Sequence, residues 1–285
     1  MRLVRTVAEL RRALGVERLA SRRIGFVPTM GALHEGHLSL ARRARAECDV
    51  VVCSVFVNPT QFNDARDLDA YPRTEAADAA LLDAAGVDII FAPGVDVMYP
   101  EGSTTSVDVG DIAEPLEGVA RGTAHFRGVA TVVAKLLNIV QPQVAYFGQK
   151  DAQQVLVVRR LVRDLDMPVE IVACPIVREA DGLAMSSRNA RLSRDARADA
   201  LGLSAALHRM EAMVAVGERA CEPLVAAGLE TLARHRIPAS AVDYLAIVDA
   251  ATLQPLSRVT DGALVAVAAH VGGVRLIDNL VVGIA

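Results

Sequence analysis

A stretch of ten residues, Pro28 to His37 (PTMGALHEGH), follows a short apolar run and precedes a segment with helical spacing. The start of a helix offers backbone N–H groups and the positive end of the helix dipole, which together suit a phosphate. His34 and His37 are three residues apart, so both side chains can face a ligand at the first helical turn. There they could donate hydrogen bonds to phosphate oxygens while charge moves during a reaction. The alternative is a pair of surface histidines, which we disfavour because the chain contains only six histidines.

Two amides form a second group. Asn58 and Gln61 lie in FVNPTQF, at the end of an apolar run. Amide side chains both donate and accept hydrogen bonds, so this pair could orient the hydroxyls and the carboxylate of a small substrate. Taken alone, an ordinary Asn-Pro turn is the favoured interpretation of this segment.

A lysine marks a third group, because the chain has 28 arginines and only two lysines, Lys135 and Lys150. Lys150 stands in FGQKDAQQ, where a predicted strand passes into a predicted helix. A cation is unfavourable at a helix N-terminus unless an anion binds there, and an ammonium suits a phosphate. Gln154 follows one turn later, and Asp151 could equally be the helix N-cap. Lys135 lies in an apolar helical pattern; we interpret it as a solvent-reaching residue, although it could point into a cleft.

Two further segments combine arginine with small polar residues. Met185 to Asn189 (MSSRN) offers two hydroxyls and the Arg188 guanidinium, which could close over a phosphate. Taken alone, an ordinary N-capped loop is favoured there. Arg121 to Gly128 contains His125 and could be a lid or a second anion contact; the alternative is a solvated loop before a helix.

Alternating apolar and amphipathic segments predict the elements that must position these groups. Strand–helix alternation is typical of an α/β fold with a doubly wound, parallel, Rossmann-like sheet. Its ligand should lie beyond the carboxyl ends of the strands. The predicted strands are 23–28, 49–57, 87–92, 144–147 and 169–174, and the predicted helices are 36–47, 74–85, 128–140 and 152–165.

The pattern changes after Cys174 and Pro175. Two Ala-rich helical segments, 193–216 and 218–235, precede three strand-like segments, 242–248, 263–270 and 275–280. We therefore predict two domains. Residues 1–176 form the Rossmann-like domain, and residues 177–285 form a smaller α+β domain that carries the MSSRN loop and closes over the site.

Composition bounds the class of function. The 285 residues are 52% hydrophobic, which permits a large core and excludes general disorder. A net charge of −4 argues against a nucleic-acid partner or an anionic membrane surface. No transmembrane run and no signal peptide is visible, and the four cysteines are scattered, so we expect a cytoplasmic protein with reduced thiols. H-E-x-x-H, G-x-G-x-x-G and P-loop patterns are absent from the sequence.

The motifs resemble a known family when they are taken together. HEGH after a first strand resembles the HIGH signature of the nucleotidyltransferase superfamily, shared with class I aminoacyl-tRNA synthetases, and MSSRN resembles their KMSKS loop. In this order, PTMGALHEGHLSL, FVNPTQF, GQKDAQQ and MSSRN are similar to the pantothenate synthetase (pantoate–β-alanine ligase) family, from about Gly25 to Arg191. The last motif departs from KMSKS because it has no lysine. Arg188 is its only cation, and a guanidinium can bind phosphate bidentately.

The resemblance implies an enzyme that uses ATP with Mg²⁺ and has no tightly bound organic cofactor. ATP and pantoate would form an enzyme-bound pantoyl-adenylate and pyrophosphate, and β-alanine would then give pantothenate and AMP. The implied catalytic residues are His37, the family's proton donor, His34, Lys150 and Arg188. The implied ATP-binding residues are Met30, Gly31, Ala32, Leu33, His34, Glu35, Gly36, His37, Gly148, Gln149, Lys150, Asp151, Val177, Met185, Ser186, Ser187 and Arg188. The residues implied for pantoate and β-alanine are Gln61, Gln154, Asn58, Tyr71 and His125.

Some expectations are less specific. Asp78 is a candidate Mg²⁺ ligand, and ATP oxygens with water could supply most of the shell. The resemblance suggests a homodimer, for which a strand such as Val50–Val55 or an exposed Ala/Val face could be the interface. Another HIGH-motif adenylyltransferase acting on a small substrate is the alternative function, but it gives no reason for the two amides. A tRNA synthetase is disfavoured by length, and a non-catalytic ATP-binding regulator should have lost some of these polar residues.

Overall fold

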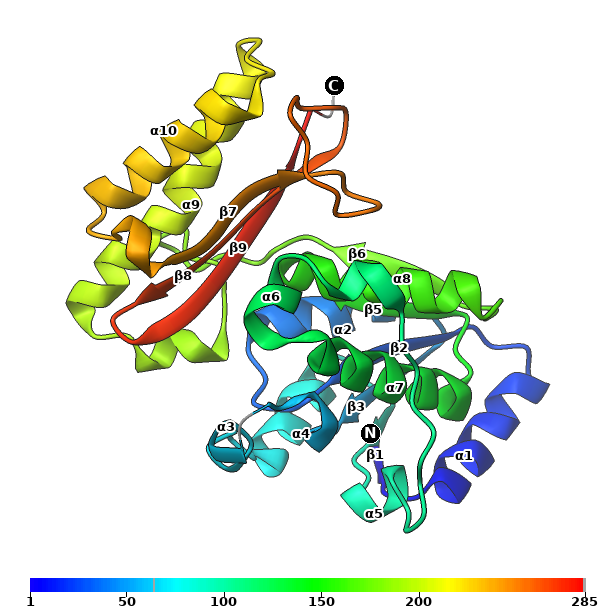
Figure 1. The fold of residues 1–285 in the computed structure, drawn as a ribbon. Helices are drawn as coiled ribbons and strands as arrows, with labels where there is room; N and C mark the ends of the chain where they lie inside the picture. The colour runs from blue at the N-terminus through cyan, green and yellow to red at the C-terminus, as the bar shows by residue number, and fades with distance from the viewer. Residues whose placement is uncertain (64, 284–285) are drawn as a thin grey trace. The chain divides into compact units, whose positions relative to one another are not determined.

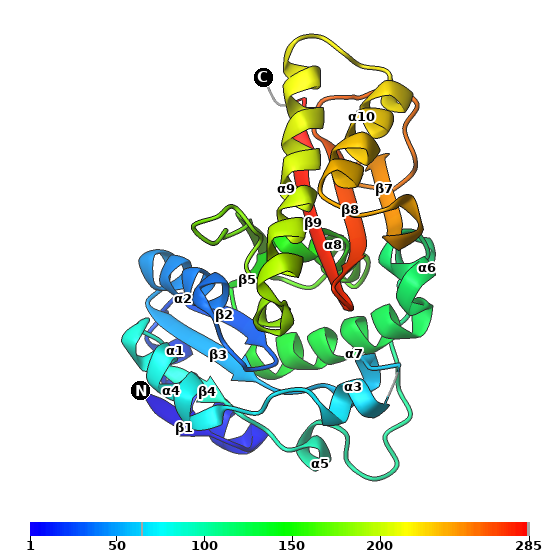
Figure 2. The same cartoon turned by 90° about the vertical axis from the view of Figure 1, so that its left-hand side faces the viewer.

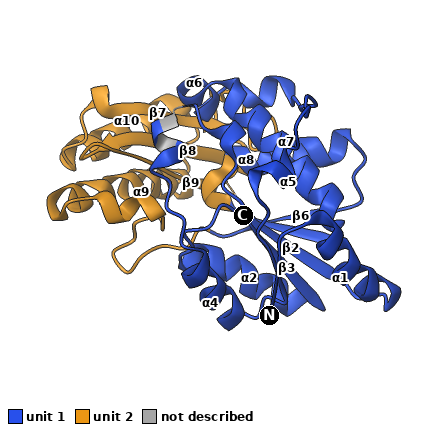
Figure 3. Ribbon diagram, turned by 90° about the horizontal axis from the view of Figure 1, so that it is seen from below, with its two compact units in different colours: residues 1–148, 153–175 blue, residues 149–152, 176–285 orange. Residues whose placement is uncertain are grey.

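Two compact units make up the chain in the computed structural model, which describes residues 1–63 and 65–283 (Figure 1, Figure 3). Unit 1 comprises residues 1–148 and 153–175, and unit 2 comprises residues 149–152 and the chain from residue 176 onward. The short segment 149–152 thus belongs to unit 2 although the chain on either side of it belongs to unit 1. The sequence pattern does not indicate that this segment belongs to unit 2, because its membership arises from contacts with residues more than a hundred positions away.

Unit 1 contains a six-stranded sheet in which every pair of neighbouring strands is parallel. The strands are β1 (Arg2–Val4), β2 (Ile24–Thr29), β3 (Val50–Val55), β4 (Ile89–Phe91), β5 (Val144–Gly148) and β6 (Glu170–Cys174). Their order in the sheet is β1-β4-β3-β2-β5-β6, so the predicted doubly wound parallel sheet is confirmed. The strand order reverses between β2 and β5, and the carboxyl ends of these two strands therefore form the crevice where such sheets bind ligands.

Helices cover both faces of this sheet (Figure 1). The helices of this part of the chain are α1 (Val7–Leu19), α2 (Glu35–Glu47), α3 (Ala65–Asp69), α4 (Glu75–Ala84), α5 (Val95–Met98), α6 (Glu117–Arg121), α7 (Thr123–Val140) and α8 (Ala152–Asp164), with 3-10 turns η1 (Pro59–Gln61) and η2 (Gly110–Ala113). Val27, Val51 and Cys53 share a core cluster with residues of α2 and α4. Ile24 and Phe26 point to the opposite face, because side chains alternate along a strand, and both are fully buried.

Some of these elements were not predicted. Apolar periodicity did not indicate β1 or α1, although Thr6 and Glu9 form a capping box at the start of α1. The segment 121–128, predicted as a loop, is mostly helical, because α6 ends at Arg121 and α7 begins at Thr123. Only Gly122, with φ +75°, interrupts the two helices. A solvated loop, the alternative considered for this segment, is therefore not what the structure has.

Unit 2 is an α+β structure, as predicted. Its elements are η3 (Gln149–Asp151), η4 (Ser187–Arg191), α9 (Arg194–Ala215), α10 (Cys221–Arg234), η5 (Ala239–Ala241), β7 (Val242–Val248), β8 (Ala263–Val271) and β9 (Val274–Val282). The three-stranded sheet is antiparallel in the order β7-β8-β9, and α9 and α10 lie side by side and share a buried apolar core with it (Figure 2).

Three other expectations can be compared with the fold. All four cysteines are buried and free, as predicted. Among the described residues, no helix has the length and apolar character needed to cross a membrane. The strand Val50–Val55 cannot be a dimer interface, because β3 is paired with β2 on one edge and with β4 on the other.

Candidate active site

A left-handed backbone turn connects β2 to α2. Gly31 has φ +81° and Ala32 has φ +50°, a region that a residue with a Cβ rarely adopts. The buried carboxylate of Asp78, on α4, holds this turn: its Oδ2 accepts from the Ala32 N–H at 3.0 Å and its Oδ1 from the Leu33 N–H at 2.9 Å. A Cβ at Gly31 would lie 3.0 Å from Asp78 Oδ2, so a glycine is required at this position. Asp78 therefore sets the entry into α2.

Backbone N–H groups fix the tautomers of His34 and His37. His34 Nδ1 accepts from the Gly36 N–H at 3.1 Å, and His37 Nδ1 accepts from the His34 N–H at 3.3 Å, which together cap α2. A ring nitrogen that accepts carries no proton, so each neutral imidazole holds its proton on Nε2. The two half-buried rings lie with centroids 4.1 Å apart. Both histidines thus carry N–H donors at a helix N-terminus, which is the polarity that a phosphate requires.

Asn58, the N-cap of η1, is buried and its orientation is unambiguous. Its Nδ2 donates to the Gly128 carbonyl at 3.2 Å, and its Oδ1 accepts from the Thr60 N–H at 3.3 Å. A carbonyl can only accept and a backbone N–H can only donate, so the amide cannot be turned round. The second Nδ2 hydrogen points to Gln61 Oε1 at 3.0 Å. The hydrogen bonds of Asn58 are therefore made within the protein, and it orients Gln61.

The side chain of Gln61 takes its polarity from Asn58. Because Gln61 Oε1 accepts, its Nε2 lies on the other side, 3.0 Å from Met30 Sδ. The Gln61 carbonyl accepts from His125 Nδ1 at 2.7 Å, so His125 carries its proton on Nδ1. The backbone of α7 packs tightly here, because a Cβ at Gly128 would lie 2.3 Å from the Thr60 carbonyl oxygen. Residues of three predicted segments, containing Met30, Gln61 and His125, therefore meet in unit 1.

Tyr99, which sequence reasoning missed, and Lys135, for which it left a cleft position open, extend this group. The Tyr99 hydroxyl donates to Asn58 Oδ1 at 2.8 Å, and the Lys135 Nζ lies 5.5 Å from the centroid of the Tyr99 ring. Lys135 is half-buried on α7 with its ammonium near the Tyr99 ring, a contact that its interpretation as a solvent-reaching residue did not include. Burial raises the pKa of the Tyr99 phenol, so the hydroxyl stays protonated and remains a donor. The one available signal was the rarity of lysine in this chain.

Of two further residues expected at the small-substrate site, Tyr71 lies at the edge of this group. The Tyr71 ring meets Phe62 edge-on, with centroids 5.7 Å apart, next to Gln61. Gln154 lies half-buried in the first turn of α8. Its neighbour Gln153 is buried instead and binds the backbone of the segment 112–117.

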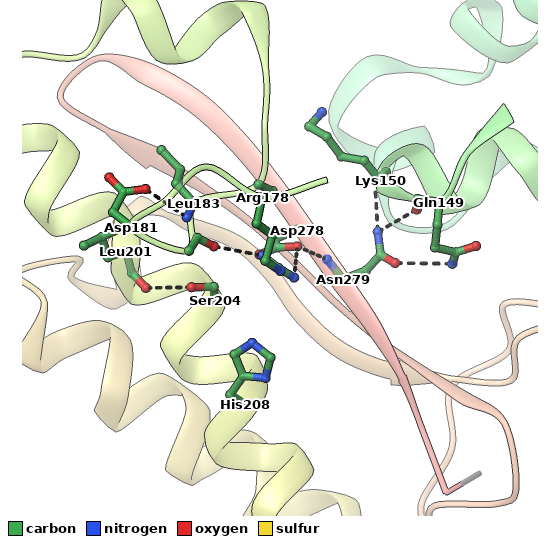
Figure 4. A network of polar contacts seen from close by, with 12 residues as sticks. Gln149, Lys150, Arg178, Asp181, Leu183, Leu201, Ser204, His208, Asp278 and Asn279 are labelled. Atoms are coloured by element: carbon green, nitrogen blue, oxygen red, sulfur yellow. Dashed lines mark hydrogen bonds and ion pairs between the residues drawn. The ribbon is translucent and has the colours of Figure 1, made fainter. Parts of the chain in front are cut away.

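In unit 2, Lys150 lies in η3 rather than in the helix that follows. Its side chain is 19% exposed and its Nζ lies 3.9 Å from Asp151 Oδ2. The buried amide of Asn279, on β9, donates to the carbonyls of Gln149 and Lys150 (Figure 4). Lys150 is therefore fixed by its backbone, while its ammonium extends away from the strand (Figure 4).

The MSSRN segment is anchored at both ends within unit 2. The Met185 N–H donates to the Val177 carbonyl at 2.9 Å, and Ser186 caps η4 by accepting from the Arg188 N–H at 3.3 Å. Buried Asn189 donates to Glu179 Oε1 at 2.6 Å. Ser187 is exposed, and Arg188 is half-buried. The loop thus holds two hydroxyls and a guanidinium on a structured turn.

A metal centre built by the protein alone finds no support. The residues described include no group of three or more His, Cys, Asp or Glu side chains that could hold a metal ion. Asp78, the candidate ligand, already accepts from two backbone N–H groups and from the Thr74 hydroxyl. A divalent cation would have to bring most of its ligands with it.

Known proteins are similar to this chain along its whole length. The family model described as pantoate-beta-alanine ligase matches residues 2–281. The pantothenate synthetase of Acidobacterium capsulatum is 56% identical over 294 residues, covering 99% of this chain and 97% of the relative.

Solved structures are also similar to this chain along nearly its whole length. The crystal structure of pantothenate synthetase from Thermus thermophilus superposes with a TM-score of 0.91 at 54% identity, covering 98% of this chain and 99% of that one. The pantoate-beta-alanine ligase of Francisella tularensis, complexed with beta-gamma ATP and beta-alanine, superposes with a TM-score of 0.80 at 33% identity, covering 99% and 97%.

Proposed function

The chain belongs to the pantoate-beta-alanine ligase family, and on that premise we propose how its residues perform the reaction. The enzyme condenses pantoate with β-alanine at the expense of ATP, and it releases pantothenate, AMP and pyrophosphate. The observation that carries this function is the match of the family model to residues 2–281, which includes every chemical group described above. A nucleotide-joining adenylyltransferase is not favoured by any of these relatives.

The first step needs charge stabilisation rather than a base, because pantoate is already a carboxylate at neutral pH. One carboxylate oxygen attacks the α-phosphorus, and the bond to pyrophosphate breaks. From unit 1, His34 and His37 donate through Nε2–H to phosphate oxygens, in keeping with the tautomers that the cap of α2 imposes. From unit 2, Lys150 and Arg188 supply positive charge to the phosphates.

The small substrates bind to donors of fixed polarity. Gln61 turns its amide nitrogen away from Asn58, so it offers N–H groups and suits the carboxylate and hydroxyl oxygens of pantoate. Gln154 and Tyr71 complete the acid site, and His125 orders the Gln61 backbone. In the second step the neutral amine of β-alanine attacks the acyl carbon. The C–O bond to the adenylate breaks, AMP leaves, and the amine proton passes to water.

Mg²⁺ enters this scheme as part of the substrate. Because the described residues offer no ready cluster of metal ligands, we place the ion on the ATP phosphates with water as its other ligands. Bound there, it neutralises part of the phosphate charge. We further propose a cytoplasmic homodimer, whose interface does not involve β3. Sedimentation at twice the mass of one chain would support the dimer.

A product assay tests the function. The purified protein is mixed with ATP, Mg²⁺, pantoate and β-alanine, and the nucleotides and pantothenate are separated by chromatography. We expect AMP and pantothenate in equal amounts, with no AMP when pantoate is omitted. Formation of ADP, or of AMP at the same rate without pantoate, would contradict the ligase function.

A further inference from the structure

Two consecutive polar residues are buried in the middle of β9, next to apolar residues on both sides. Asp278 and Asn279 on β9 are 2% and 3% exposed, while Val274, Leu276 and Val282 of the same strand belong to the apolar core of unit 2. Buried polar groups are costly unless they are bonded, so a pair of them in a core strand needs an explanation. Because side chains alternate along a strand, the two side chains point to opposite faces of the sheet.

Asn279 holds the turn that carries Lys150. Its Nδ2 donates to the Gln149 carbonyl at 3.0 Å and to the Lys150 carbonyl at 2.9 Å, and its Oδ1 accepts from Gln149 Nε2 at 3.3 Å (Figure 4). Both amide hydrogens are used on carbonyls, which fixes the orientation of the side chain. These bonds attach η3 to β9 and account for the membership of residues 149–152 in unit 2.

Asp278 holds the hairpin that precedes the MSSRN loop. It accepts from both terminal nitrogens of Arg178, at 2.7 and 3.1 Å, a bidentate pair. Arg178 also donates to the Gly182 carbonyl at 3.2 Å and forms a β-bridge with Ala184, one residue before the MSSRN segment. The carboxylate further accepts from the Asn279 N–H at 2.8 Å, which joins the two anchors (Figure 4).

We propose that Asp278 and Asn279 are positioning residues that hold Lys150 and the MSSRN loop in a fixed relation on one strand. The inference rests on the proposed function, because it takes Lys150 and Arg188 to be the cations that act on the phosphates. Neither Asp278 nor Asn279 needs to touch a substrate. Their effect passes through the backbone of η3 and through the Arg178 hairpin, so losing them displaces the cations without removing them.

Asn279 is the better residue to change. Removal of Asp278 leaves the Arg178 guanidinium without its buried partner, which is strongly destabilising and would confuse folding with activity. Asn279→Ala removes two donors to carbonyls, and Asn279→Asp places a carboxylate against those carbonyls with no change in size. The matched control is Asn138→Ala, since Asn138 lies exposed on α7 and donates within its own helix, to the Ala134 carbonyl.

The experiment measures pantoate-dependent pyrophosphate release by wild type, Asn279→Ala, Asn279→Asp, Lys150→Ala and the double variant Asn279→Ala/Lys150→Ala. We expect kcat to fall roughly 10- to 100-fold in Asn279→Ala and further in Asn279→Asp, because a displacement of about 1 Å at a reacting group has that effect. The KM for β-alanine should not change. In the double variant, the loss should equal that of Lys150→Ala within about twofold, because Asn279 acts through Lys150.

Each other outcome has a distinct meaning. A purely structural role would lower the melting temperature of Asn279→Ala and leave its kcat within about twofold of wild type. A fall in kcat that multiplies with that of Lys150→Ala in the double variant would mean that Asn279 does not act through Lys150. Either result would overturn the inference while the ligase function stands. If wild type itself releases no pyrophosphate in the presence of pantoate, the proposed function is overturned and the inference with it. Both comparisons require that the control Asn138→Ala has the same kcat and melting temperature as wild type.

Discussion

At the scale of single residues, a few backbone groups decide what the candidate site can recognise. The Gly128 carbonyl and the Thr60 N–H fix Asn58, Asn58 fixes Gln61, and two further N–H groups fix His34 and His37. In each case the polarity is imposed by a partner that can only donate or only accept. The outcome is a set of N–H donors, which suits substrates that are anions.

This polarity predicts the effect of Gln61→Glu. The variant keeps the size of the side chain but replaces the amide donors with an oxygen that faces the substrate carboxylate. We expect the KM for pantoate to rise roughly 10- to 100-fold, because a hydrogen bond to a charged group is worth about 1.5–3 kcal/mol. The KM for ATP should change little. Steady-state kinetics with each substrate varied in turn would measure both values.

Gln254→Glu is the matched control, because Gln254 is exposed in unit 2. It should leave all three KM values as they are in wild type. An unchanged KM for pantoate in Gln61→Glu would mean that the acid binds elsewhere.

At this scale, some residues of the candidate site are predictable from the sequence and others are not. HEGH, Asn58, Gln61 and Lys150 could be selected because residue type and local spacing are visible along the chain. The roles of three other residues could not be predicted, because each depends on a contact with a residue 36 or more positions away in the chain. These residues are Tyr99, Lys135 and Asn279. Lys135 shows the difference: its type was conspicuous, but the ring beneath it belongs to a separate segment.

At the scale of elements, the turn between β2 and α2 depends on a residue of α4. Asp78 holds Ala32 in the left-handed region and thereby sets where α2 begins. The start of α2 in turn determines the positions of His34 and His37. A helix was predictable for residues 74–85 from its periodicity. Its role in shaping a turn more than forty residues earlier was not, because that role exists only once the two elements have packed.

Asp78→Ala tests this dependence. The change leaves the half-buried N–H groups of Ala32 and Leu33 without these acceptors, at a cost of about 1–3 kcal/mol for each unsatisfied group. We expect the free energy of unfolding to fall by about 3 kcal/mol, and kcat for adenylate formation to fall with it, because the cap of α2 is displaced. Urea denaturation and single-turnover kinetics measure the two effects.

Asp83→Ala on the same helix serves as the control. The Asp83 side chain is 62% exposed and pairs with the chain's amino terminus, so its loss should change the unfolding free energy by less than about 0.5 kcal/mol. If Asp78→Ala matched Asp83→Ala in both measurements, the turn would not depend on this carboxylate.

At the scale of the whole molecule, alternating patterns along the chain were sufficient to predict a parallel sheet followed by a small α+β region, and both are confirmed. Period and length decide such elements locally. The transfer of residues 149–152 to unit 2 was not predictable, because it depends on the buried Asn279 near the end of the chain. It was also not predictable that β3 cannot be a dimer interface, because this follows from the pairing of both its edges within the sheet.

The central claim is that the reaction passes through a pantoyl-adenylate, so that one carboxylate oxygen of pantoate becomes part of AMP. Pantoate labelled with ¹⁸O in both carboxylate oxygens, supplied with ATP, Mg²⁺ and β-alanine, tests this directly. If the carboxylate attacks the α-phosphorus and the amine then breaks the acyl C–O bond, each AMP carries one ¹⁸O and each pantothenate retains one in its amide carbonyl. Mass spectrometry of the two products would show both labels. AMP without ¹⁸O, formed together with pantothenate, would contradict the acyl-adenylate and with it the role assigned to the phosphate-facing residues.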